Sequence, residues 1–159
     1  MSFQSSVRRV LAGAIVGDII LDGPQRAVPA ILDSTDPLKN VIGRAFFRKA
    51  GEDLKVSAEG ANTLVFAGIL SNSKLYALNG SSLAPSITLE NAKEVQLLQM
   101  GYVVVSLLTA GNIGDAIFAS DTTGELRVGA AAGFTAVPNA TVAYQNTAGA
   151  GLAIIKLTN

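Results

Sequence analysis

Four aspartates near the amino terminus are the strongest candidates for chemistry in this sequence. Asp18 and Asp22 lie close together, and Asp33 and Asp36 follow them. Grouped carboxylates can bind Ca²⁺ or, as a pair, hydrolyse glycosidic bonds. The spacing does not match an EF-hand loop, which places its ligands at alternate positions and ends in a glutamate. Each aspartate lies beside a glycine, serine, threonine or proline, so roles in turns and helix caps are the favoured interpretation.

The residue types that the sequence lacks exclude most other chemistry. There is no histidine, which is the commonest general base, and no cysteine, so thiolate nucleophiles, zinc–thiolate sites and disulfides are excluded. Gly149-Ala150-Gly151 lacks the third glycine and the phosphate-binding lysine of a nucleotide loop. We therefore predict no catalytic residue, no cofactor and no metal site. An enzyme that uses carboxylates alone is the remaining catalytic alternative.

The charge balance indicates which partners to expect. Twelve basic and twelve acidic residues give a net charge of zero, and charged residues make up 15% of the chain, against about 25% in a typical soluble domain. The neutral balance provides no basic surface for nucleic acid or for an anionic membrane, and no apolar run reaches the roughly 18 residues of a spanning helix. With 49% hydrophobic residues, much of the surface is expected to be buried against other protein subunits.

The first 40 residues differ from the rest of the chain. Arg8 and Arg9 precede a short apolar segment, as in a secretory signal, but Gly17-Asp18 interrupts that segment early, so a cleaved signal is not favoured. Three of the five prolines occur here, and clean alternation of apolar and polar residues is missing. We interpret residues 1–40 as an arm with long loops that lies on the barrel or on a neighbour. Residues 41–159 are the barrel, and the whole is one domain.

Short apolar segments bounded by turn residues predict an all-β fold, a small β-barrel or jelly-roll-like sandwich with at most one short helix. The expected strands are Ala14–Val16, Ile19–Leu21, Val41–Arg48, Leu64–Leu70, Lys74–Leu78, Val95–Leu98, Tyr102–Leu107, Ala116–Ser120, Glu125–Val128 and Gly151–Leu157. Two hairpins are expected, one turning at Asn79-Gly80 and one at Asp121–Gly124.

Three segments have further structural implications. The continuous apolar run from Tyr102 to Leu108 predicts a strand that is covered on both faces. Met100-Gly101, just before it, suits a bulge. Leu89–Leu98 is rich in helix formers, so helix and strand both stay open there, and a short helical turn is possible at Pro24–Leu32.

Several segments, taken in order, resemble the structural cement proteins of tailed bacteriophages. They are Met1-Ser2-Phe3-Gln4, Ala14-Ile15-Val16-Gly17-Asp18, Pro24-Gln25-Arg26-Ala27, Val41-Ile42-Gly43-Arg44-Ala45-Phe46, Val95–Gly101 with Tyr102–Val104, and Ile113–Ala119 with Thr122-Thr123-Gly124. The family's Pro-Arg dipeptide is interrupted here by Gln25, and Ile69-Leu70-Ser71 stands where the family usually has His-Arg. These departures concern partner contacts more than the fold.

The resemblance implies a decoration protein of the virion, made in the cytoplasm of the host bacterium. Such a protein binds the outer surface of the phage head as a dimer or trimer and bridges neighbouring subunits of the major capsid protein. An interface arm is then expected to use apolar and arginine side chains. The candidate interface residues are Phe3, Val7, Arg8, Arg9, Val10 and Arg26. The alternative is a carbohydrate-binding β-sandwich module of a phage tail or fibre.

Overall fold

The computed structural model describes residues 15–20, 23–72, 88–144 and 149–158. Within these ranges the chain forms ten β-strands and one short 3₁₀ helix. They are β1 (Ile19–Ile20), β2 (Arg26–Leu32), η1 (Pro37–Lys39), β3 (Ala45–Arg48), β4 (Lys55–Ser57), β5 (Val65–Leu70), β6 (Glu94–Leu107), β7 (Ala116–Ser120), β8 (Leu126–Val128), β9 (Phe134–Tyr144) and β10 (Gly151–Thr158). The predicted all-β barrel class is confirmed.

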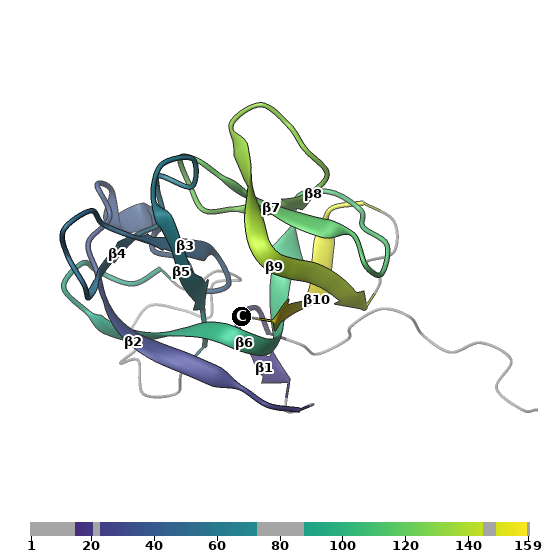
Figure 1. Cartoon of the computed structure of the whole chain (residues 1–159), viewed down its shortest axis with the longest axis horizontal. Helices are drawn as coiled ribbons and strands as arrows, with labels where there is room; N and C mark the ends of the chain where they lie inside the picture. Colours follow the sequence, from purple (N-terminus) through teal and green to yellow (C-terminus); the bar gives the residue numbers. More distant parts are fainter. Residues whose placement is uncertain (1–14, 21–22, 73–87, 145–148, 159) are drawn as a thin grey trace, which may run out of the picture.

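The long strand β6 organises the fold. Its first half pairs with β2 and β5, and its second half pairs with β10, β1 and β8. The pairings close two rings of strands, β6–β2–β4–β3–β5 and β6–β10–β9–β7–β8, and both rings include β6. We call them the β3–β5 barrel and the β7–β10 barrel. Figure 1 shows the first on the left and the second on the right.

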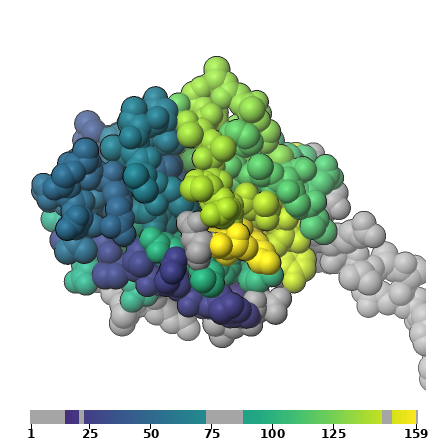
Figure 2. Space-filling model, viewed as in Figure 1, coloured from purple at the N-terminus to yellow at the C-terminus, as the bar shows by residue number. Residues whose placement is uncertain are grey.

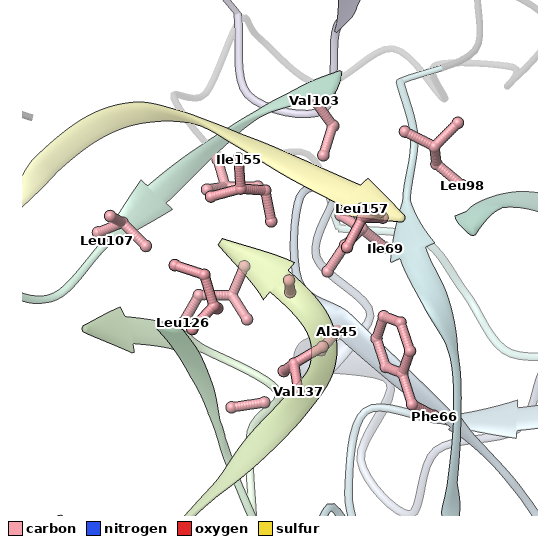
Figure 3. Packing of buried hydrophobic residues seen from close by; sticks show 14 of the residues in the cluster. Ala45, Phe66, Ile69, Leu98, Val103, Leu107, Leu126, Val137, Ile155 and Leu157 are labelled. Atoms are coloured by element: carbon pink, nitrogen blue, oxygen red, sulfur yellow. The ribbon is translucent and has the colours of Figure 1, made fainter. Parts of the chain in front are cut away.

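Each barrel has a hydrophobic core, and the paired strands β3 and β5 contribute to both. Phe46, Ala67 and Leu70 belong to the core of the β3–β5 barrel. Their neighbours along the same strands face the other core. The side chains drawn there come from β3, β5, β6, β8, β9 and β10 and point toward one another (Figure 3). Among those labelled are Ala45, Phe66, Ile69, Leu98, Val103, Leu126, Ile155 and Leu157. The paired strands β3 and β5 are therefore largely buried on both faces, with one core on each side of them.

The centre of β6 confirms two predictions. Val103, Val104 and Val105 are all fully buried, as expected for a strand covered on both faces. The register between β2 and β6 shifts near the predicted bulge: Arg26 lies opposite Met100, but the next residue, Ala27, lies opposite Leu98. The shift leaves Gln99 as the extra residue, immediately before Met100-Gly101.

Three strands were missing from the sequence prediction, namely β2, β4 and β9. The helical turn suggested for Pro24–Leu32 is wrong, because that segment is β2, and Leu89–Leu98 is not helical, because it leads into β6. In β2 the alternation is hidden: Ala30 and Leu32 are buried, while the outward residues Pro29 and Ile31 are apolar too. The proposed strand and hairpin at Lys74–Leu78 and Asn79-Gly80 lie outside the described residues.

The strand β9 was missed because its pattern is broken in the middle. Pro138 and Asn139 follow one another there, and Asn139 lies within the strand in the left-handed region with φ +53°. Its pairing with β7 jumps at this point, from Ala116 opposite Thr141 to Phe118 opposite Ala136. The strand therefore carries a pronounced bulge, which interrupts any regular period of two.

Part of the first 40 residues is built into the sheet. β1 and β2 lie end to end along one side of β6, and β2 also pairs with β4. The long-loop interpretation is therefore wrong for Arg26–Leu32. Residues 1–14 lie outside the described residues, so an arm formed by them stays a prediction.

Candidate functional site

The aspartates that were candidates for chemistry lie apart and have separate structural roles. Asp18 accepts a hydrogen bond from the Asn72 side chain at 3.1 Å. Asp33 forms a salt bridge with Lys49 at 2.9 Å, which lowers the pKa of the Asp33 carboxyl below its usual value. Asp36 caps η1 by accepting from the Leu38 amide at 2.9 Å, as the cap interpretation predicts. Asp22 is outside the described residues, within which no cluster of three acidic side chains could hold a metal.

The strongest electrostatic perturbation falls on Glu59, which sequence reasoning did not select. Partial burial of its carboxylate favours the neutral form and would raise the pKa. Hydrogen bonds from Lys39, at 2.7 Å, and from the Thr35 amide, at 3.2 Å, lower the pKa, and so does the positive charge of Lys39. Together these effects outweigh that of burial. The result is a pKa lowered to about 2. Glu59 is therefore charged at neutral pH and anchors the loop around η1.

A small buried polar network continues from this loop. The Asn91 Oδ1 accepts hydrogen bonds from the Ser34 amide and from the Asn40 Nδ2. The Asn91 Nδ2 donates to the Ser34 carbonyl. Asn40 is completely buried, and its Oδ1 has no hydrogen-bond partner. The backbone N–H and C=O of Ser34 fix which end of the Asn91 amide is the oxygen. Because Asn40 must donate to that oxygen, the orientation of its own side-chain amide is fixed as well. The network fixes the loop between β2 and β3 against the segment that precedes β6.

The segments that resemble the cement family meet in space at two joints. At the first, the Gly17 amide donates to the Val104 carbonyl at 2.7 Å, and the Gly17 carbonyl accepts from the Asn72 amide at 2.8 Å. A Cβ on Gly17 would lie 2.1 Å from the Ile42 side chain, so no larger residue fits. This joint fastens the segment before β1 against the start of the Val41–Phe46 segment.

The second joint connects the two barrels. The turn between β7 and β8 lies against β3, where the Ala45 amide donates to the Gly124 carbonyl at 2.9 Å. Arg44 reaches the same turn, with a salt bridge of 2.9 Å to Glu125 and a hydrogen bond of 3.2 Å to the Thr123 carbonyl. The glycine has φ +67°, and a Cβ there would lie 2.4 Å from the Ala45 carbonyl oxygen. We call these contacts the barrel joint.

The geometry of both joints is structural. Their polar groups are occupied by one another, because the Gly17 amide and carbonyl, the Ala45 amide and the Arg44 guanidinium all have partners within the chain. Outside the joints, the lysines Lys39, Lys49 and Lys55 each pair with a carboxylate, so none resembles an activated amine. No helix in the described part of the chain is long and apolar enough to cross a membrane.

Comparison with known proteins identifies the family of this chain. Residues 3–158 match the family model described as "Structural cement protein (E217 gp24/Pam3 gp6)". This chain belongs to that family of phage structural cement proteins, and its function is that of a structural protein that stabilises the capsid.

A solved structure supports the fold. A chain from "The capsid of Myoviridae Phage XM1" superimposes with a TM-score of 0.69 at 18% sequence identity, covering 100% of this chain and 99% of that one. At this identity the likeness shows a shared fold. No curated protein matches the chain.

The predicted interface residues are only partly located. Phe3, Val7, Arg8, Arg9 and Val10 are outside the described residues. Arg26 is exposed at the first residue of β2. The structure thus leaves the arm interface as a prediction and places one of its proposed members on an open surface.

Sequence reasoning missed where the aromatic side chains would lie. Phe46, Phe47 and Phe66 are buried in the cores. The other described aromatic residues are partly or fully exposed and belong to strands of the β7–β10 barrel: Tyr102, Phe118, Phe134 and Tyr144. A signal was present, because the run from Phe134 to Tyr144 contains no charged residue, but it was not recognised as a strand.

Proposed function

We propose that this chain binds the outer surface of the major capsid protein lattice and bridges neighbouring subunits of it. Besides family membership, one observation supports the proposal: the segment that contains β7, β8 and β9 has few charged side chains without a partner. Between Leu108 and Tyr144 there are four charged residues, Asp115, Asp121, Glu125 and Arg127. The three acids each accept a hydrogen bond from within the chain. Such a surface loses little hydration energy when another protein covers it.

The proposal includes an arm and self-association. Residues 1–14 carry Arg8 and Arg9 and no acidic residue, so they suit an acidic or polar groove on a neighbouring subunit. Association of the chain into a dimer or trimer would let each particle contact several capsid subunits. The protein would then reside on the outside of the virion after synthesis in the host cytoplasm, with neither nucleic acid nor membrane as a partner.

Co-sedimentation with expanded heads that lack this protein tests the proposal. Purified chain is titrated onto the heads, and bound copies are counted per capsid subunit. We expect saturation at a fixed simple ratio, together with heads that release their DNA at a higher temperature. A chain that stays in the supernatant at every concentration would contradict the proposal.

The arm is tested separately by deleting residues 1–12. We expect this truncated chain to keep the melting temperature of the full chain, since the described strands begin later in the sequence, and to bind heads more weakly. If the truncated chain binds as tightly as the full chain, the arm does not contribute to attachment.

A further inference from the structure

The outer face of β7, β8 and β9 has the residue composition of a protein-binding contact. Phe118 lies opposite Arg127 on β8 and opposite Ala136 on β9, so these three side chains share one face of the sheet. The Arg127 guanidinium lies over the Phe134 ring, with its carbon 5.1 Å from the ring centroid. We call Phe118, Arg127, Phe134 and Ala136 the aromatic–arginine patch. In Figure 2, β7 (green) and β9 (yellow-green) form the right-hand part of the face toward the viewer.

The described residues leave the patch only partly covered. The rings of Phe118 and Phe134 are half-buried, and Ala136 is exposed. An aromatic ring left at a surface forgoes the hydrophobic gain that the three core phenylalanines obtain. Aromatic and arginine side chains are also the types enriched at the energetically important positions of interfaces.

The charge of Arg127 indicates what the partner presents. Its Nε–H donates to the Val128 carbonyl at 3.4 Å, and no carboxylate lies within salt-bridge distance of it in the described ranges. The nearby acids are engaged elsewhere, Glu125 with Arg44 and Asp121 with the Thr135 hydroxyl at 2.7 Å. A guanidinium stacked on a ring and free of a carboxylate partner retains donors for an incoming carboxylate.

We propose that the aromatic–arginine patch is the contact by which this chain docks onto the capsid lattice, and that the capsid surface meets it with a carboxylate among apolar side chains. This inference rests on the proposed function and adds the face that is used and the chemistry of the partner. The carboxylate pairs with Arg127, while the apolar groups cover Phe118 and Phe134. Water is excluded from the pair, which strengthens it.

Two variants test the patch, each with a matched control on the other barrel. Arg127→Glu reverses the charge, and its control is Arg48→Glu, because Arg48 is exposed on β3 and also has no carboxylate within salt-bridge distance among the described residues. Ala136→Lys adds a bulky charge to the patch, and its control is Ala50→Lys, also at an exposed alanine. Both substitutions in the patch are at surface-facing positions, so the fold is expected to be retained, as thermal melting would verify.

We expect Arg127→Glu and Ala136→Lys each to weaken binding to heads by about tenfold or more, and both controls to bind as the unchanged chain does. If both patch variants bind normally while the unchanged chain binds heads, the patch is not the docking contact, although the proposed function still stands. If only Ala136→Lys weakens binding, the face is right but the carboxylate partner is wrong. If the unchanged chain does not bind heads at all, the proposed function fails, and this inference fails with it.

Discussion

Replacing Gly124 with alanine tests whether the barrel joint holds the two barrels together. Gly133 provides a matched control, because both glycines have similar left-handed backbones, with φ +67° and φ +75°. Around Gly133 a new Cβ would meet no atom within 4 Å, whereas at Gly124 it would lie 2.4 Å from the Ala45 oxygen and 3.0 Å from the Ala58 oxygen. The two substitutions therefore share the backbone strain and differ in the space available.

The expected magnitudes follow from these contacts. Alanine in the left-handed region costs about 1–2 kcal/mol, which is the whole expected effect of Gly133→Ala. At Gly124 both obstructing atoms belong to the backbone, so the turn must move away from β3. That movement weakens the hydrogen bond from the Ala45 amide and the bond from Arg44 to Thr123. At about 0.5–1.5 kcal/mol for each bond, Gly124→Ala should destabilise the chain by about 1–3 kcal/mol more than Gly133→Ala does.

Urea unfolding of both variants, followed by circular dichroism, measures the difference in the free energy of unfolding. A difference of this size corresponds to a melting temperature about 2–12 °C lower for the Gly124 variant in a chain of this length. Equal stabilities for the two variants would refute the reasoning, because they would show that the turn is not held closely against β3.

Three further predictions concern other parts of the chain. The pKa of Glu59 is lowered from 4.5 to about 2, so its ionised form stabilises the fold above pH 4.5, and this contribution is lost as the pH falls from 4.5 toward about 2. Glu59→Gln should therefore lower the free energy of unfolding by about 1–3 kcal/mol at neutral pH and by progressively less in acid. Urea titrations at several pH values would measure this. Leu97→Ala removes a fully buried side chain and should destabilise by about 2–5 kcal/mol in the same assay. Pro29→Thr restores an amide on β2 and should increase self-association, as light scattering would detect.

The reasoning behind the proline prediction is geometric. In β2 the Leu32 amide donates toward β6, to the Lys93 carbonyl, whereas the Ile31 amide donates the other way, to Leu54. By this alternation position 29 faces away from β6, on the stretch of β2 that precedes its pairing with β4. Proline has no amide to offer a further strand. If Pro29→Thr stays as monodisperse as the unchanged chain, this edge is protected by something else.

The pH prediction has its own control. Lys49 and Asp33 form a similar but more exposed salt bridge, with 36% and 39% of their side chains exposed, so Asp33→Asn should alter stability much less. An acid dependence that is unchanged by Glu59→Gln would show that other carboxylates determine it.

The composition and the local patterns of the sequence determined the class of protein. The absence of histidine and cysteine excluded most catalysis, and the neutral, charge-poor composition indicated a protein covered by other proteins. Strands with unbroken apolar runs, such as β5 and the second half of β6, were predicted because burial on both faces leaves a signal within a few residues. The hairpin of β7 and β8 was predicted because its turn residues are local.

Only the tertiary structure decided how distant segments combine. β2 was missed because its outward residues are apolar, and β9 because a bulge at Asn139 breaks its period. The barrel joint brings Arg44 to Glu125 across 81 positions of sequence, and no local pattern encodes such a pairing. The aromatic–arginine patch likewise depends on register, since Phe118 meets Ala136 only because β9 is bulged. Contacts within a few residues follow from local propensity, whereas contacts between remote strands depend on the packing of the whole chain.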